Sequence, residues 1–261
     1  MRRAYRITLI SIAAGLLIAG GLKLMSIAAI ASLTETSQTE HFVFAVDERD
    51  RSLLTTLPAE LEGAHDRIAA DLQHPLQRQV VVRIYPDVHR RNMAIGNPFP
   101  WPRAGGNASP GLIETISPHA IQDQPFPPLT ALAHELTHVV VMEINPQLHR
   151  GWLQEGLASY EMDPSPSGYR ASVKTTIRDD VAAGRIPSFT DLNVVTSNWP
   201  RFWQMHGYEF SYTFVEFVRN DHGADTLNRL IRAPDDYSGV FNRTEDQVWD
   251  EWVVYLKRHY R

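Results

Sequence analysis

Apolar residues recur at helical spacing through most of the second half of the chain, whereas the first half holds a few short β-rich runs. Residues 41–46, 79–85 and 111–117 are rich in β-branched, aromatic and other apolar residues and are predicted as strands. Residues 50–72 carry leucine and isoleucine at helical spacing and are predicted as a helix between the first two strands. Residues 96–110 are crowded with proline, glycine and asparagine, so a loop is predicted there.

The later helices have clear stop signals. A helix is predicted from Pro128 to about Ile144, where Asn145-Pro146 ends it, and a second over residues 151–162, which ends at Asp163-Pro164. Further helices are predicted at residues 170–183, 208–220, 224–232 and 245–259. Because the strands come early and the helices late, the order predicts an α+β fold, with a short N-terminal sheet and a mostly helical C-terminal half.

The N-terminus has the pattern of a membrane-directed segment. Arg2, Arg3 and Arg6 precede residues 7–33, which are almost wholly apolar except for Lys23. This predicts an apolar helix, and two interpretations stay open for residues 1–34: an uncleaved signal anchor, or a signal peptide cleaved near residues 29–31. In both, the arginines stay in the cytoplasm and the body, residues 35–261, lies outside. A buried core helix is a third interpretation, disfavoured by the basic flank.

Charge and composition exclude several classes of function. The chain has 261 residues and a formal net charge of −5, but the first 33 residues carry +4 and the remainder −9. A body this acidic is a poor partner for phosphate backbones, so nucleic-acid binding is not expected. The absence of cysteine excludes disulfides, a cysteine nucleophile and thiolate metal sites. Any transition metal must therefore bind histidine and carboxylate side chains.

Residues 134–138 read His-Glu-Leu-Thr-His and carry the candidate chemistry. Spaced four apart on a helix, His134 and His138 lie on one face and can reach a single ion, while Glu135 can meet a water molecule at that ion. The apolar stripe of the same helix leaves both histidines on a different surface; it consists of Leu129, Leu132, Leu136, Val139 and Val140.

A third candidate ligand, Glu155, follows His138 by seventeen residues. Two histidines and one glutamate, with a fourth position left to water, form the ligand set of hydrolytic zinc sites. Asn145-Pro146 lets the chain turn back, and the small residues Gly156 and Ala158 permit close packing of the second helix. The alternative interpretation is an ordinary helix pair with two core histidines and a surface glutamate.

His65 and His74, on or beside the first predicted helix, are expected to be solvent-exposed.

These two segments, residues 134–138 and 152–160, resemble the gluzincins, the thermolysin-like zinc metallopeptidases of the peptidase MA type. The resemblance covers about residues 110–235 and is specific only in the two zinc segments. It implies Zn²⁺ held by His134, His138 and Glu155, with Glu135 as general base, and a small thermolysin-like catalytic domain whose edge strand lies along the substrate cleft. Residues 111–117 are expected to be that strand.

The family also implies a tyrosine or histidine that donates a hydrogen bond to the oxyanion, from the region after the glutamate helix. Tyr208 is the first candidate, with His206 and Tyr212 as alternatives. Some branches of the family carry an acid four residues after the glutamate ligand, where this chain has Ser159.

The expected function is extracytoplasmic hydrolysis of peptide bonds in a peptide or protein substrate, by a zinc-activated water and a glutamate base. Two other classes remain open: a catalytically silent gluzincin-like domain that binds peptides or partners, and a structural domain without metal. The intact Glu135 argues against the silent domain, because a binding module has no use for a general base.

The leader generates a prediction about topology. A reporter fused after Arg261 should be active outside the cytoplasm, because the three N-terminal arginines hold the N-terminus inside. A cytoplasmic reporter would exclude both the anchor and the signal peptide. The mass of the mature chain then separates these two, since only cleavage removes about thirty residues.

Overall fold

The computed structural model describes residues 21–96, 106–120, 127–162 and 168–261, which form an α+β fold as predicted. Five strands make one mixed sheet in the order β1-β2-β3-β5-β4. The central strands β2, β3 and β5 are parallel, and the outer strands β1 and β4 pair with them antiparallel. The strands are β1 (Glu35–Gln38), β2 (Phe42–Val46), β3 (Val80–Tyr85), β4 (Gly106–Ser109) and β5 (Leu112–Ile116).

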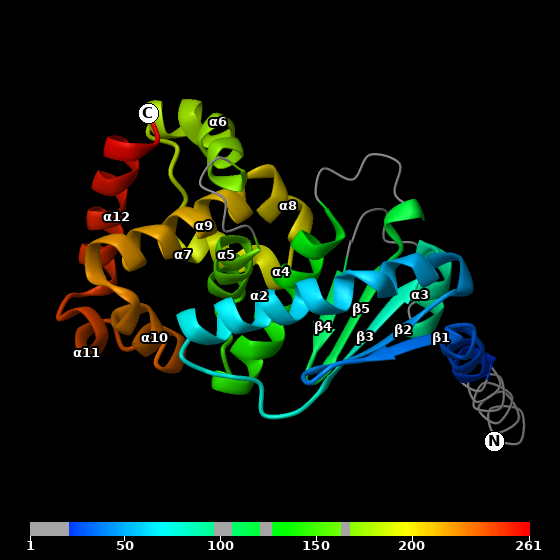
Figure 1. Cartoon of the computed structure of the whole chain (residues 1–261). Helices are drawn as coiled ribbons and strands as arrows, with labels where there is room; N and C mark the ends of the chain where they lie inside the picture. The colour runs from blue at the N-terminus through cyan, green and yellow to red at the C-terminus, as the bar shows by residue number, and fades with distance from the viewer. Residues whose placement is uncertain (1–20, 97–105, 121–126, 163–167) are drawn as a thin grey trace, which may run out of the picture.

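Helix α2 crosses the sheet, and the helices from α6 to α12 pack together on one side of it (Figure 1). The α-helices are α2 (Leu57–Asp71), α3 (Val88–Ala94), α4 (Pro128–Ile144), α5 (Gly151–Glu161), α6 (Tyr169–Ala182), α7 (Phe189–Leu192), α8 (Trp199–Gln204), α9 (Gly207–Phe217), α10 (Ala224–Arg232), α11 (Tyr237–Phe241) and α12 (Glu245–His259). Short helices of other types are η1 (Glu48–Thr55), η2 (Pro118–Ala120), η3 (Asn193–Thr196) and the π-helical η4 (Val218–His222).

The three predicted strands form the parallel centre of the sheet, and the long predicted helices are present. The helix predicted over residues 50–72 is divided: η1 ends at Thr55, and α2 then starts at Leu57 with Pro58 in its first turn. Proline suits that position because the first turn needs no donor from its backbone nitrogen. β1 and β4 were not predicted, since neither has an apolar alternation.

The prediction that residues 111–117 form the edge strand is wrong. β5 holds most of residues 111–117, but it is an inner strand between β3 and β4, and β4 takes the edge. Gly111 has φ +77°, a left-handed conformation that glycine adopts readily, so the chain reverses there and residues 106–109 pair with β5. The end of the predicted loop is therefore a strand, whereas residues 97–105 lie outside the described part.

The N-terminal prediction is only partly within the described residues. Residues 21–31 are helical and lead into β1, while residues 1–20 are outside the description. Among the described helices, none has the length and apolar content needed to span a bilayer. The anchor and the signal peptide both stay predictions.

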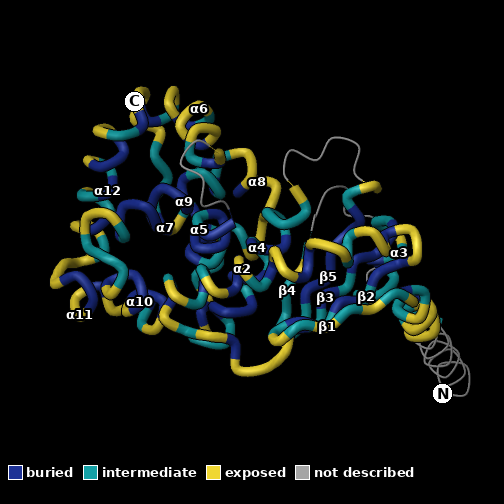
Figure 2. The backbone as a smooth tube through the Cα atoms, in the orientation of Figure 1, coloured by how far each residue is buried: buried dark blue, intermediate teal, exposed yellow. Residues whose placement is uncertain are grey.

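Helix α5 runs buried between its neighbours in the helical half (Figure 2). Its Trp152 is fully buried and stacks on Phe189 of α7, with ring centroids 4.9 Å apart and planes at 4°. On the same helix, a Cβ atom added to Gly156 would lie 2.5 Å from the backbone oxygen of Ser211 in α9. Glycine therefore allows the backbones of α5 and α9 to approach each other closely, and this contact sets the position of the neighbouring Glu155.

The close approach can be tested with two glycine substitutions. Gly156→Ala should lower the free energy of unfolding by about 1–3 kcal/mol, because the methyl group meets helix backbone that cannot move aside cheaply. Gly63→Ala in α2 is the matched control: nothing lies within 4 Å of the added Cβ, so the higher helix propensity of alanine should stabilise the protein by about 0.5–1 kcal/mol. Equal effects in urea titrations would contradict the packing argument.

Candidate metal centre

Two consecutive helices bring the candidate ligands together. His134 and His138 come from one face of α4, and Glu155 comes from the first half of α5. α4 ends at Ile144 because Asn145 leaves the helical conformation and Pro146 follows it, so α5 turns back against α4. The other face of α4 is buried, with Leu132, Leu136, Val139 and Val140 in the hydrophobic core.

The three ligand atoms lie at nearly equal distances from one another. His134 Nε2 is 3.2 Å from His138 Nε2 and 3.3 Å from Glu155 Oε2. His138 Nε2 is 3.7 Å from the same Glu155 oxygen. The two imidazole planes cross at 80°, so both nitrogens can point at one place without the rings stacking.

These separations fit a tetrahedral ion. Zinc with bonds of about 2.0–2.1 Å keeps its ligand atoms about 3.3–3.4 Å apart. Glu155 Oε2 is also buried, and the polar atoms that it meets are the two imidazole nitrogens at 3.3 and 3.7 Å. Three such atoms close to one another suit a divalent cation such as zinc.

The two carboxyls of the site have opposite electrostatic surroundings. Burial raises the pKa of Glu135, and the two histidines only partly oppose this shift. Burial also disfavours the charge of Glu155, but His138 and His134 outweigh it and hold the pKa of Glu155 well below its usual value. Burial likewise opposes the charge of His138, yet Glu155 raises its pKa. The pKa of Glu155 is thus lowered, which suits a group that binds a cation as a carboxylate, and that of Glu135 is raised, which suits a group that takes up a proton.

Glu135 has two notable neighbours, the edge strand β4 and the buried side chain of Arg91. A Cβ atom at Gly106 of β4 would be only 2.5 Å from Glu135 Oε1, so the edge strand passes directly over this carboxyl. Arg91 of α3 is 2% exposed, and its charge opposes the rise in the pKa of Glu135. Gly106 and Arg91 were not predicted from the sequence, because no local pattern links either of them to residue 135.

Of the three candidate oxyanion donors, Tyr208 lies at the metal centre. It is near the start of α9, with its ring centroid 6.5 Å from that of His134, and its hydroxyl accepts a hydrogen bond from Trp199 Nε1 at 2.9 Å. Burial and the charge of Glu155 raise its pKa, so it keeps its proton.

The two alternative donors are engaged in other contacts. His206 Nδ1 lies 2.8 Å from Asp180 Oδ2, and Tyr212 is buried with its ring against Tyr160 and Tyr169. The geometry therefore favours Tyr208 among the three.

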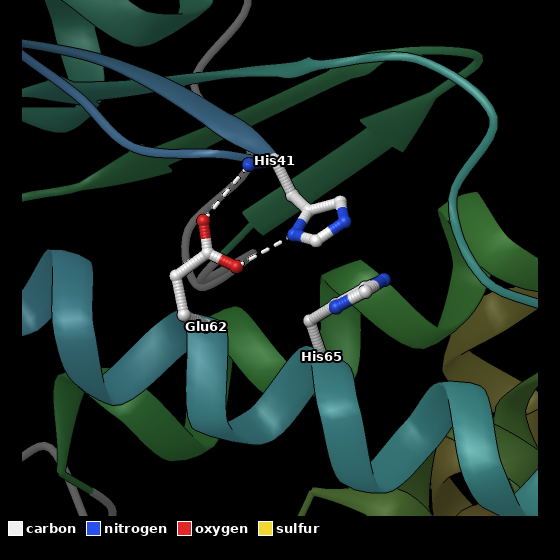
Figure 3. Close-up of side chains that lie close together, drawn as sticks. All are labelled: His41, Glu62 and His65. Carbon is white, nitrogen blue, oxygen red and sulfur yellow. Dashed lines mark hydrogen bonds and ion pairs between the residues drawn. The ribbon is translucent and has the colours of Figure 1, made fainter.

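A second cluster, His41, Glu62 and His65, joins the start of β2 to α2 (Figure 3). His41 Nδ1 lies 2.7 Å from Glu62 Oε2, and the two imidazoles are stacked, with centroids 3.9 Å apart and planes at 29°. His65 Nε2 accepts the Leu76 N–H, so its Nδ1 carries the proton and faces Asp66. A protonated nitrogen cannot bind a metal. The arrangement of this cluster is that of a hydrogen-bonded contact that holds β2 against α2.

The expectation that His65 is solvent-exposed is wrong, because its side chain is only 3% exposed. The stack on His41, from a distant part of the chain, buries it. His74 is partly buried, with its Nε2 3.4 Å from Glu143 Oε2.

The chain matches no protein-family model and no curated protein. The gluzincin resemblance therefore rests on the residues of the two zinc segments, and the function must be argued from the geometry of the site.

The two clusters generate a prediction about metal content. The purified full chain should bind about one zinc ion, and His138→Ala should weaken binding sharply, since it removes one of three protein ligands. His41→Ala, the matched control in the second cluster, should leave the zinc content unchanged. Zinc content is measured by atomic absorption after dialysis at a fixed free-zinc concentration. Full zinc in His138→Ala, or loss of zinc in His41→Ala alone, would contradict the assignment.

Proposed function

We propose that this protein is a zinc metallopeptidase of the gluzincin type, with His134, His138 and Glu155 as zinc ligands. The observation that carries the proposal is the set of three ligand atoms 3.2–3.7 Å apart, with Glu135 in the same turn of α4. When bound, zinc polarises a peptide carbonyl and lowers the pKa of a water towards about 7. The thermolysin-like form of the catalytic domain belongs to the same proposal.

Glu135 is the proton carrier in this proposal. It accepts a proton from the attacking water and then gives it to the nitrogen of the leaving amine. Its raised pKa suits the second step, because a carboxyl that readily holds a proton can also deliver it. The Tyr208 hydroxyl donates a hydrogen bond to the oxyanion that develops on the former carbonyl oxygen.

The edge strand supplies a place for the substrate backbone. Among the described residues β4 pairs with β5 alone, and its first residue, Gly106, lies against Glu135. An extended peptide can add to such an edge through main-chain hydrogen bonds, and this would bring one of its carbonyls to the metal centre. The substrate class is therefore a peptide or an unfolded protein segment. With the leader as anchor or signal peptide, the catalytic body acts outside the cytoplasm.

Glu135→Gln tests the mechanism. The side chain keeps its size but cannot accept the water proton, so cleavage of a mixed peptide library should fall by about 10²–10⁴-fold with zinc retained. Glu143→Gln on the same helix is the matched control and should retain wild-type activity, since its contacts are with His74, Gln77 and Arg78. If the Glu135→Gln variant cleaved peptides at the wild-type rate, the peptidase mechanism would be rejected. If the wild-type protein bound peptides in the presence of zinc but did not cleave them, the silent domain would be favoured.

A further inference from the structure

The corner between α8 and α9 holds the hydroxyl of Tyr208 through a second side chain. Trp199, the first residue of α8, donates its indole N–H to the Tyr208 oxygen at 2.9 Å. An indole nitrogen is a donor only, whereas a phenol has one proton and two acceptor lone pairs. The bond therefore occupies a lone pair of Tyr208 and leaves its proton for a different acceptor.

The corner is built so that this bond has a fixed geometry. A Cβ atom at Gly207 would lie 2.4 Å from the ring of Phe202, so only glycine lets the two helices meet so closely. Phe202 is fully buried, and its ring packs edge-to-face on Tyr208 with centroids 5.1 Å apart. His206 joins α8 to α9 in a left-handed conformation, φ 56°, with Asp180 as partner of its Nδ1. Phe202 thus confines the ring of Tyr208, and Trp199 confines its oxygen.

The ring that carries this hydroxyl lies beside the candidate metal centre. The ring of Tyr208 lies next to that of His134, and the charges of Glu155 and Glu135 both act on the phenol. We propose that Trp199 is a positioning residue: its N–H keeps the Tyr208 proton from pointing towards α8 and directs it to the metal centre. Donation to the phenol oxygen also polarises the O–H, which strengthens its own hydrogen bond to an oxyanion.

This inference rests on the proposed peptidase function and adds a residue that the two zinc segments do not imply. Simple packing explains Trp199 less well, because the residue is 37% exposed and its loss would leave little cavity in the core. Trp199→Phe keeps an aromatic ring and removes the N–H. Trp203→Phe is the matched control on the same helix, at a side chain that is 59% exposed.

The hydrogen bond can be tested without activity and without metal. The full chain has six tryptophans, so ¹⁵N-indole labelling gives a small set of N–H resonances, and Trp199→Phe identifies the one from Trp199. Tyr208→Phe should shift that resonance and speed its exchange with solvent, because the acceptor is gone, and should leave the Trp203 resonance in place. An unmoved Trp199 resonance would overturn the proposal.

Kinetics then separates positioning from packing. With zinc bound, Trp199→Phe should lower kcat about tenfold with little change in KM, the size expected for one hydrogen bond. In a Tyr208→Phe background the same change should cost less than about twofold, since no hydroxyl is left to direct. Equal losses in both backgrounds, or wild-type kcat in Trp199→Phe, would overturn the positioning role. Trp203→Phe should cleave at the wild-type rate.

Failure of the proposed function has a different signature. A zinc-loaded wild type that cleaves no peptide in the library and binds no phosphinic peptide, a mimic of the tetrahedral intermediate, would reject the peptidase. The kinetic role of Trp199 would fall with it. The indole resonance would still report whether the bond to Tyr208 exists, so the two failures remain distinguishable.

Discussion

The candidate metal centre depends on how closely α5 approaches its neighbours. Glu155 can reach the two histidines only while α5 lies against α4, and α5 also packs closely on α9. Gly156 lies next to Glu155 and admits the backbone of Ser211 where a methyl group would collide with it. Trp152 stacks on Phe189 and meets the ring of Phe214 edge-to-face, and these buried contacts help to hold α5 in place. A glycine and a tryptophan that touch no ligand atom thereby determine where the ligand carboxylate lies.

The same packing explains how the two glutamates of the site have pKa values shifted in opposite directions. Glu155 lies 3.3 and 3.7 Å from the two imidazole nitrogens, and this interaction outweighs the effect of burial on its pKa. For Glu135 burial dominates, and the opposing influence of Arg91 is weaker than that of the histidines. The histidine charges that act on Glu135 come from its own helix, whereas those that act on Glu155 come from the neighbouring helix. The proposed ligand and the proposed base are therefore distinguished by how each carboxyl lies relative to the same two histidines.

Local patterns predicted the parts of the fold that local physics controls. α4 and α5 follow from apolar periodicity and from Asn145-Pro146, and the parallel strands follow from continuous β-branched runs. β4 could not be predicted because Gly-Asn-Ala-Ser has no apolar face, and it becomes a strand only by pairing with β5. The burial of His65 is equally non-local, since the ring that covers it belongs to His41 on β2. The candidate ligands came from spacing alone, whereas Trp199, Gly106 and Arg91 carry no signal near the motif and needed the three-dimensional arrangement.

The small size of β4 limits which conformations of another polypeptide can pair with it. An edge of four residues with small side chains offers backbone donors and acceptors but almost no apolar surface. A helix or an inner strand of a folded protein has already used its own backbone groups and has nothing to offer such an edge. An extended segment with free backbone groups can pair there, whatever its side chains. If β4 receives the substrate as proposed, selection at this edge depends on the conformation of the incoming chain, and a segment that has already paired its own backbone groups is excluded.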